Sequence, residues 1–226
     1  MSEAAFLGDT MLRLLGGLPL TVQLAAVSVV AGALLAVGLA LLRASSRLGA
    51  AAVAAYVFVF RGSPLLVQIF LIYYGLGQFP WVRASPLWPF LRQPWWCAVL
   101  ALTLNTAAYG SEIIRGGLAS VPPGAVEGAR ALGLTRRQTM RHVVLPLALR
   151  QALPGYGNEV VIMVKSTALA STITLMELTG VARALVSETF RAVEVFLCAG
   201  AIYLALNALV AGGVRLMERR LAVPGL

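Results

Sequence analysis

The chain has 226 residues, 59% of them hydrophobic and 12% charged, and its mean hydropathy is +0.85. This composition excludes an ordinary soluble domain and is typical of a membrane protein. The formal net charge of +9 does not require nucleic acid as a partner, because basic residues beside membrane helices explain its sign.

Four runs without a charged residue follow one another along the chain. They cover residues 14–42, 62–82, 93–111 and 195–214. Each contains the roughly 20 apolar residues that a bilayer about 30 Å thick requires. Two further stretches, 48–60 and 151–176, complete or extend spans. The first run is too long for a signal peptide, so we expect it to be a retained helix.

These runs predict an all-α membrane protein that forms a single transmembrane domain, residues 1–226. The five expected transmembrane helices cover about 18–42, 50–78, 95–117, 152–175 and 194–215. The long loop 118–150 joins the third helix to the fourth. Cys97 and Cys198 both fall in apolar spans, where they are expected to pack as small hydrophobic residues.

The distribution of arginine predicts the orientation. If the N-terminus is outside, eleven arginines lie on the face of the C-terminus: Arg43, Arg47, Arg115, Arg130, Arg136, Arg137, Arg141, Arg150, Arg215, Arg219 and Arg220. Five lie on the other face: Arg13, Arg83, Arg92, Arg183 and Arg191. Since arginine favours the cytoplasmic side, the C-terminus and the 118–150 loop are expected in the cytoplasm.

Aromatic residues and prolines gather between the second and third helices. They are Trp81, Trp88, Trp95, Trp96, Pro80, Pro86, Pro89 and Pro94. Indole rings favour the boundary between lipid headgroups and hydrocarbon, and the prolines prevent a continuous helix. This connection is therefore expected at the outer membrane surface.

The expected cytoplasmic loop contains two short helices separated by a sharp bend. Pro122 and Pro123 suit the first turn of one helix, with Ser120 as its expected cap. Gly133 suits the left-handed residue that ends that helix. Thr135, with glutamine three residues later, has the form of a capping box that opens the second helix.

The second of these helices is expected to be short, because Pro146 limits how far it can run unbroken. On charge alone, the arginines in this loop could simply enforce the orientation and meet anionic lipid.

The positions of several residues in the loop favour a more specific interpretation. Glu127, Ala129, Gly133, Val143, Leu145 and Pro146 resemble the EAA loop of ABC importer permeases. In that loop an E-A-A triplet, a glycine and a terminal hydrophobic-x-Leu-Pro recur at fixed offsets. Gly128 replaces the central alanine here, which weakens the helix slightly.

The resemblance extends over nearly the whole chain. RGSPLLVQIFLIYYG at 61–75, LNTAAYGSEIIRG at 104–116 and NEVVIMVKSTALASTITLMELTG at 158–180 are similar to the polar amino acid branch of these permeases. Within that branch they most resemble subunits that import histidine, arginine and related basic amino acids. The resemblance implies the ABC importer permease fold in a bacterial inner membrane.

The resemblance also implies partners. The chain would pair with a second permease, either a copy or a relative, and with two cytoplasmic ATPase subunits. Those subunits would bind ATP and Mg, so this chain itself needs no cofactor or metal. An extracytoplasmic amino-acid-binding protein would deliver the substrate.

The residues expected to contact the ATPase subunits lie in the coupling loop. They are Glu127, Gly128, Ala129, Arg130, Gly133 and Arg137. The family's role for the glutamate, an ionic contact with a basic residue of the ATPase, is carried onto Glu127. Gly133 supplies the bend. Closure of the ATPase dimer would move this rigid element and rock the attached spans between inward-open and outward-open states.

Polar residues within the spans predict a substrate site. A charged group at the centre of a membrane helix costs roughly 2.5 to 3.5 kcal/mol, so each needs a partner or a wet cavity. The candidates are Arg61, Gln68, Asn105, Tyr109, Glu112, Asn158, Glu159 and Lys165. Arg61 would bind the substrate carboxylate, and Glu112 its ammonium or basic side chain. Alternatively, the charged groups pair across helices and fix the packing.

Other functions remain as alternatives. The sequence contains no Walker A motif, HExxH or CxxC and no recognisable nucleophile with its base. A membrane enzyme is therefore disfavoured, and an ATP-driven pump would need a separate motor. The strongest alternative is a stand-alone ion-coupled transporter or channel for a small polar solute. A structural membrane scaffold is the third.

Overall fold

The computed structural model describes residues 3–221, and within this range every element of secondary structure is a helix. Three helices are long and apolar enough to cross a membrane: Glu3–Ser45, Pro94–Ala119 and Ala192–Arg220. Two bent helix pairs raise the number of candidate spans to as many as five.

The helix α7 (Pro94–Ala119) is the centre of the bundle. It packs against α2 (Leu18–Ser45) and α10 (Leu145–Ser166). Small residues allow the close approach, as is common between membrane helices. A Cβ atom on Gly32 of α2 would collide with the methyl group of Thr106, and one on Gly110 would lie 3.0 Å from the Cβ of Ala36.

The second expected span differs from the continuous helix over 50–78. The helix α3 (Arg47–Gly62) ends at Ser63, and the chain restarts as α4 (Leu65–Phe70), bent by 103°. The bend follows from Pro64, whose ring forces the preceding residue into an extended conformation. Ser63 indeed has φ −108° and ψ 145°.

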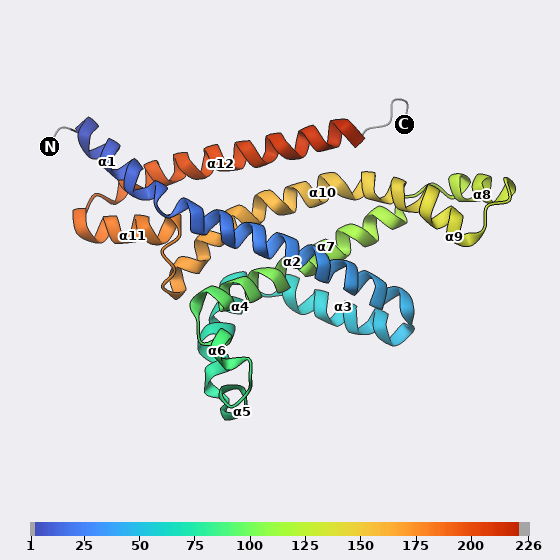
Figure 1. Cartoon of the computed structure of the whole chain (residues 1–226), viewed down its shortest axis with the longest axis horizontal. Helices are drawn as coiled ribbons and strands as arrows, with labels where there is room; N and C mark the ends of the chain where they lie inside the picture. Colours follow the sequence, from blue (N-terminus) through green and yellow to red (C-terminus); the bar gives the residue numbers. More distant parts are fainter. Residues whose placement is uncertain (1–2, 222–226) are drawn as a thin grey trace.

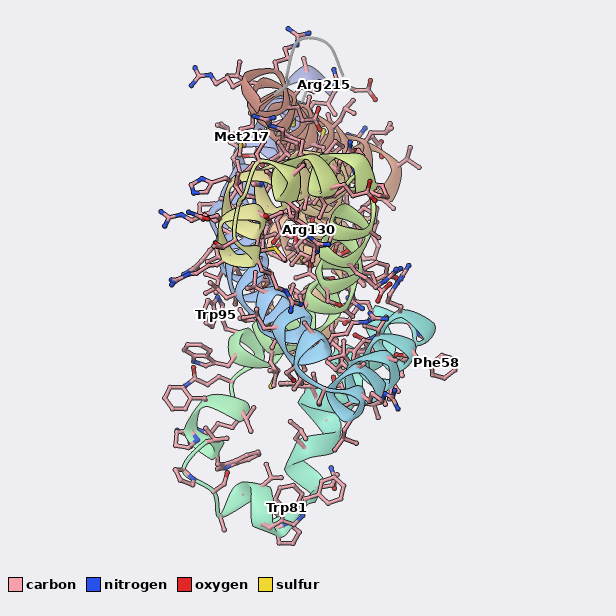
Figure 2. The ribbon with its side chains drawn as sticks, turned by 90° about the vertical axis from the view of Figure 1, so that its right-hand side faces the viewer. Phe58, Trp81, Trp95, Arg130, Arg215 and Met217 are labelled. Atoms are coloured by element: carbon pink, nitrogen blue, oxygen red, sulfur yellow. The ribbon has the colours of Figure 1, made fainter. Side chains whose placement is uncertain are left out.

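An arm continues from α4 away from the bundle. It comprises the π-helix Leu71–Gly75, the 3-10 helix Leu76–Gln78 and the short helices α5 (Pro80–Arg83) and α6 (Trp88–Leu91). The tip is aromatic, with Trp81 71% exposed (Figure 2). This is the connection that the sequence predicts at the outer membrane surface.

The loop after α7 folds into α8 (Pro123–Ala131) and α9 (Arg136–Thr139). Gly133 has φ +81°, and Thr135 forms the capping box with Gln138, so both predictions are confirmed. The prediction that Ser120 caps the first helix is wrong, because the cap position is occupied by Pro122.

The prediction that the helix beginning at Arg136 is short is also wrong. A π-helix, Met140–Val144, joins α9 to α10, and a 3-10 helix, Thr167–Ile173, extends α10. Helical structure therefore runs from Arg136 to Ile173 without a sharp break. The wider π turn lies directly before Pro146 and provides the local adjustment that the proline needs. Figure 1 shows α8 and α9 at one end of the long axis.

The opposite end of the long axis holds α1 (Glu3–Leu15) and α11 (Leu178–Thr189) (Figure 1). The last helix, α12 (Ala192–Leu221), packs against α10, α1 and α11. Glu177 is fully buried here and accepts hydrogen bonds from the backbone N–H of Gly180 and the hydroxyl of Tyr203, each at 2.8 Å. This carboxylate therefore fixes the start of α11 to α12.

Candidate functional site

A polar cavity of about 450 Å³ lies where the chain bends between α3 and α4. Residues of the bend, α7 and α10 line it: Arg61, Gly62, Ser63, Pro64, Leu65, Asn105, Tyr109, Glu159, Ile162, Met163 and Ser166. The structure thus brings together four of the eight substrate-site candidates. They are Arg61, Asn105, Tyr109 and Glu159.

Arg61 provides the positive charge of this cavity. It belongs to the last turn of α3, and its guanidinium carbon lies 4.9 Å from the centre of the Tyr109 ring. Cation–π stacking of this kind holds a guanidinium without neutralising it. Within residues 3–221 Arg61 forms no ion pair. Its charge is therefore available to a ligand carboxylate.

Glu159 provides the negative charge. It is only 5% exposed, and its Oε1 accepts a hydrogen bond from the Thr106 hydroxyl at 2.7 Å. No ion pair neutralises it among the described residues. The cavity therefore contains a cation from one wall and a carboxylate from another, the arrangement that an amino acid zwitterion requires.

Gln68 does not line the cavity. It is 6% exposed, and its Nε2 donates to the backbone oxygens of Phe60 at 2.8 Å and Ser63 at 3.1 Å. Asn105 donates to the Gln68 Oε1 at 3.1 Å and to the Phe60 oxygen at 3.3 Å. The two amides thus supply donors to the carbonyl groups that the end of α3 leaves without helical partners.

Glu112 also lies away from the cavity lining. Its carboxylate pairs with Arg43 of α2 and, at 2.7 Å, with Arg115 one turn further along α7. These ion pairs correspond to the alternative in which the charged groups within the spans fix packing. In this structure Glu159, and not Glu112, is the carboxylate of the cavity.

Asn158 and Lys165 of α10 are exposed on the surface of the chain and do not line the cavity. Lys165 makes no ion pair with any residue in the described range. Sequence reasoning missed Ile162 and Met163 as cavity walls, although both lie one turn from Glu159.

The coupling candidates lie on the α8–α9 hairpin, where α8 is anchored by Ala129, which is 6% exposed. Glu127, Gly128, Arg130, Gly133 and Arg137 are all exposed. Figure 2 looks at this end of the molecule and labels Arg130 on α8. The hairpin therefore presents charge of both signs around a rigid bend.

Sequence reasoning missed one residue of the hairpin. Leu132 is 83% exposed, next to the bend at Gly133. A partner protein that docks on the charged hairpin would also cover Leu132. In the sequence, Leu132 could have been noticed as the single large apolar side chain between Arg130 and Gly133.

Comparisons with known proteins agree with the membrane fold. Residues 10–223 match the family described as "Binding-protein-dependent transport system inner membrane component". The octopine transport system permease protein OccM of Rhizobium radiobacter is 59% identical over 96% of this chain and 89% of its own length. The nopaline transport system permease protein NocM of Agrobacterium fabrum is 50% identical over 91% of this chain and 86% of its own length.

A third relative and two solved structures extend the comparison. The arginine ABC transporter permease protein ArtM of Haemophilus influenzae is 42% identical over 90% of both chains. The crystal structure of an amino acid ABC transporter with histidines has a chain that is 34% identical, with a TM-score of 0.86 over 97% of this chain and 99% of that one.

The second structure is an inward-facing form of the MetNI methionine ABC transporter. It has a TM-score of 0.77 at 19% identity, over 99% of this chain and 100% of that one, and supports the fold alone. From the family match and these relatives, the chain belongs to the family of binding-protein-dependent transport system inner membrane components.

Proposed function

We propose that this chain is the permease subunit of an ATP-driven importer of polar amino acids, in particular basic ones, in a bacterial inner membrane. The observation that carries the proposal is the cavity with Arg61 on one wall and Glu159 on another. Arg61 binds the substrate carboxylate, and Glu159 binds its ammonium or guanidinium group. Relatives named for octopine, nopaline and arginine support this substrate class.

The orientation follows the arginine distribution, with the N-terminus outside and α8 and α9 in the cytoplasm. There the α8–α9 hairpin contacts an ATPase subunit through Glu127 and Arg130 of α8 and Arg137 of α9. Leu132 enters an apolar pocket of the same partner. The ATPase pair binds ATP and Mg, and this chain holds no cofactor. An extracytoplasmic binding protein delivers the amino acid.

The continuity of the helix supports transmission from α8 to the cavity. Helical structure from Arg136 to Ile173 includes Glu159, and the 20 residues from Thr139 to Glu159 span about 30 Å at 1.5 Å per residue. A displacement of the hairpin therefore moves a wall of the cavity, which alternates between the two sides of the membrane. Asn158 and Lys165 face a second permease, either a copy or a relative.

Reconstitution of the complete importer in liposomes tests the proposal. Uptake of arginine, histidine, glutamine and aspartate is measured with the ATPase subunits, the binding protein and ATP. We expect uptake that depends on ATP and is fastest for the basic amino acids. Equal uptake by the permease alone under an ion gradient would contradict the proposal and favour a stand-alone transporter.

A further inference from the structure

A second hollow of the molecule, separate from the polar cavity, is apolar throughout. It has a volume of about 220 Å³ and lies between α2, α10 and α12. Its walls are valines, alanines and one leucine, including Val30, Val160, Val164, Leu206 and Val210. Val30 is 60% exposed, so the hollow is open at the surface of the chain. We call it the α2–α10–α12 groove.

Two arginines lie at matching distances from this groove. Arg220 is 10 and 14 residues beyond Val210 and Leu206 along α12, which corresponds to about 15 and 21 Å at 1.5 Å per residue. Arg150 is 10 and 14 residues before Val160 and Val164 along α10, at the same distances. An interval of 14 residues is nearly four turns, so each arginine shares a face with its groove residue.

The two helices carry these arginines towards the same end of the molecule. The α10 and α12 backbones meet where Gly157 faces Val214, since a Cβ atom at Gly157 would collide with the Val214 side chain. Arg150 lies seven residues from that contact and Arg220 lies six. The C-terminal part of α12 is marked by Arg215 and Met217 in Figure 2.

Both guanidinium groups are available for a ligand. Arg150 and Arg220 are exposed, and neither forms an ion pair with a residue between 3 and 221. The third wall of the groove, α2, also carries an arginine at a similar distance. Arg43 follows Val30 by 13 residues along α2, but it is paired with Glu112. The acidic residue nearest in sequence, Glu218, lies two positions from Arg220 and therefore points to another side of α12.

We propose that the groove binds an anionic phospholipid of the leaflet on the arginine side. Half of a hydrocarbon core about 30 Å thick is about 15 Å, so an acyl chain whose end reaches the groove places its phosphate at the level of Arg150 and Arg220. The aliphatic walls fit the acyl chain, and the two guanidinium groups fit the phosphate. A neutral lipid would leave this pair of cations without a counter-charge.

Native mass spectrometry of the purified importer tests this assignment. The complex is stripped of lipid in detergent and titrated with either phosphatidylglycerol or phosphatidylcholine. We expect the unchanged protein to retain phosphatidylglycerol preferentially. The double variant R150Q/R220Q is expected to bind phosphatidylglycerol roughly tenfold more weakly. Its affinity for phosphatidylcholine should be unchanged.

Two matched controls separate the site from general surface charge and general hydrophobicity. Arg219→Gln removes a cation one residue away, turned by about 100° around α12, and should leave lipid retention unchanged. Leu206→Trp fills the groove and should expel the lipid, whereas Leu204→Trp, at a position that is 73% exposed and outside the groove, should not.

Three results would overturn the proposal. The first is equal retention of the two lipids by the unchanged protein. The second is full retention of phosphatidylglycerol by R150Q/R220Q. The third is a photo-crosslinking residue at position 30 that joins the chain to a second permease, because a protein would then occupy the groove. None of these outcomes depends on the transported substrate, so they do not test the proposed transport function.

Discussion

Two glutamates on neighbouring helices of the bundle have very different surroundings. Glu112 makes two ion pairs, whereas Glu159 accepts a single hydrogen bond, from Thr106, and faces the polar cavity. A carboxylate that is buried without an ion pair is costly in a membrane protein, and such residues mark substrate pathways. Glu159 is therefore the residue from which we expect the largest effect on substrate recognition.

The variant Glu159→Gln keeps the shape of the side chain and its hydrogen bond to Thr106 but removes the charge. In the reconstituted importer we expect at least a tenfold loss of arginine uptake, since hydrogen bonds to charged groups contribute about 1.5 to 3 kcal/mol. Uptake of a neutral polar amino acid should fall less. Glu188→Gln, which removes an exposed charge paired with Arg13, serves as the control. Unchanged arginine uptake in the Glu159 variant would exclude it from the site.

At this scale the sequence predicted which residues need a partner, but not which partner each one has. Asn105, Tyr109 and Glu112 were all expected in the substrate site, yet Glu112 lies beside Arg43 because of the way α2 packs on α7. Likewise, Gln68 faces the carbonyl groups at the end of α3 only because the chain turns back there. Contacts between helices depend on how the helices pack, which the spacing of residues along a single helix does not show.

At the scale of the element, the pairing of α2 with α7 depends on one position without a side chain. Gly32 faces Thr106 so closely that an added methyl group needs a shift of the Thr106 side chain or of the helices, whereas Gly38 of the same helix has nothing within 4 Å of its Cβ position. We expect Gly32→Ala to lower the free energy of unfolding by about 1 to 3 kcal/mol through overpacking. Gly38→Ala should not lower it.

Thermal unfolding of the purified complex measures this difference between the two alanine variants. Equal melting temperatures for both would mean that α2 and α7 do not approach as closely as the structure shows. Because both changes add one methyl group to the same helix, intrinsic helix propensity affects them alike.

In the proposed function, the α8–α9 hairpin is the element that contacts the ATPase. Glu127→Lys reverses an exposed charge without removing a buried contact, so the chain should still insert and assemble. We expect ATP-driven uptake to fall by roughly tenfold, because an interfacial ion pair becomes a repulsion. Membrane fractionation checks insertion, and Glu188→Lys provides the same charge change far from the hairpin. Normal uptake with Glu127→Lys would remove this residue from the coupling contact.

Local sequence signals predicted the elements well where a single residue decides the backbone. The left-handed Gly133 and the capping box at Thr135 are examples. The expected second helix, 50–78, contains Pro64, and the structure bends there by 103°. The prediction that Pro146 limits the helix was wrong, because the helix accommodates the proline with a π turn. No local pattern in the sequence indicates that turn.

At the scale of the whole molecule, one uninterrupted helical segment joins two regions with different tasks. It begins at Arg136 within the exposed hairpin and reaches Glu159 in the cavity and then Ile173. An apolar stretch predicted the span at one end of this segment, but it could not show that the span and the short helix at the other end are one body. That continuity comes from the backbone between Met140 and Val144.

Because the segment is continuous, its number of residues fixes the direction in which the hairpin faces relative to Glu159. One alanine inserted after Gly155 would turn everything before it by about 100° relative to Glu159, so the hairpin would face away from the ATPase while both ends kept their own structure. We expect ATP-driven uptake to be abolished although the chain still reaches the membrane. The same insertion after Ser85, between α5 and α6, should leave uptake intact. In the proposed mechanism, the length and the helical phase of this segment therefore set how far, and in which direction, a movement of the hairpin displaces Glu159.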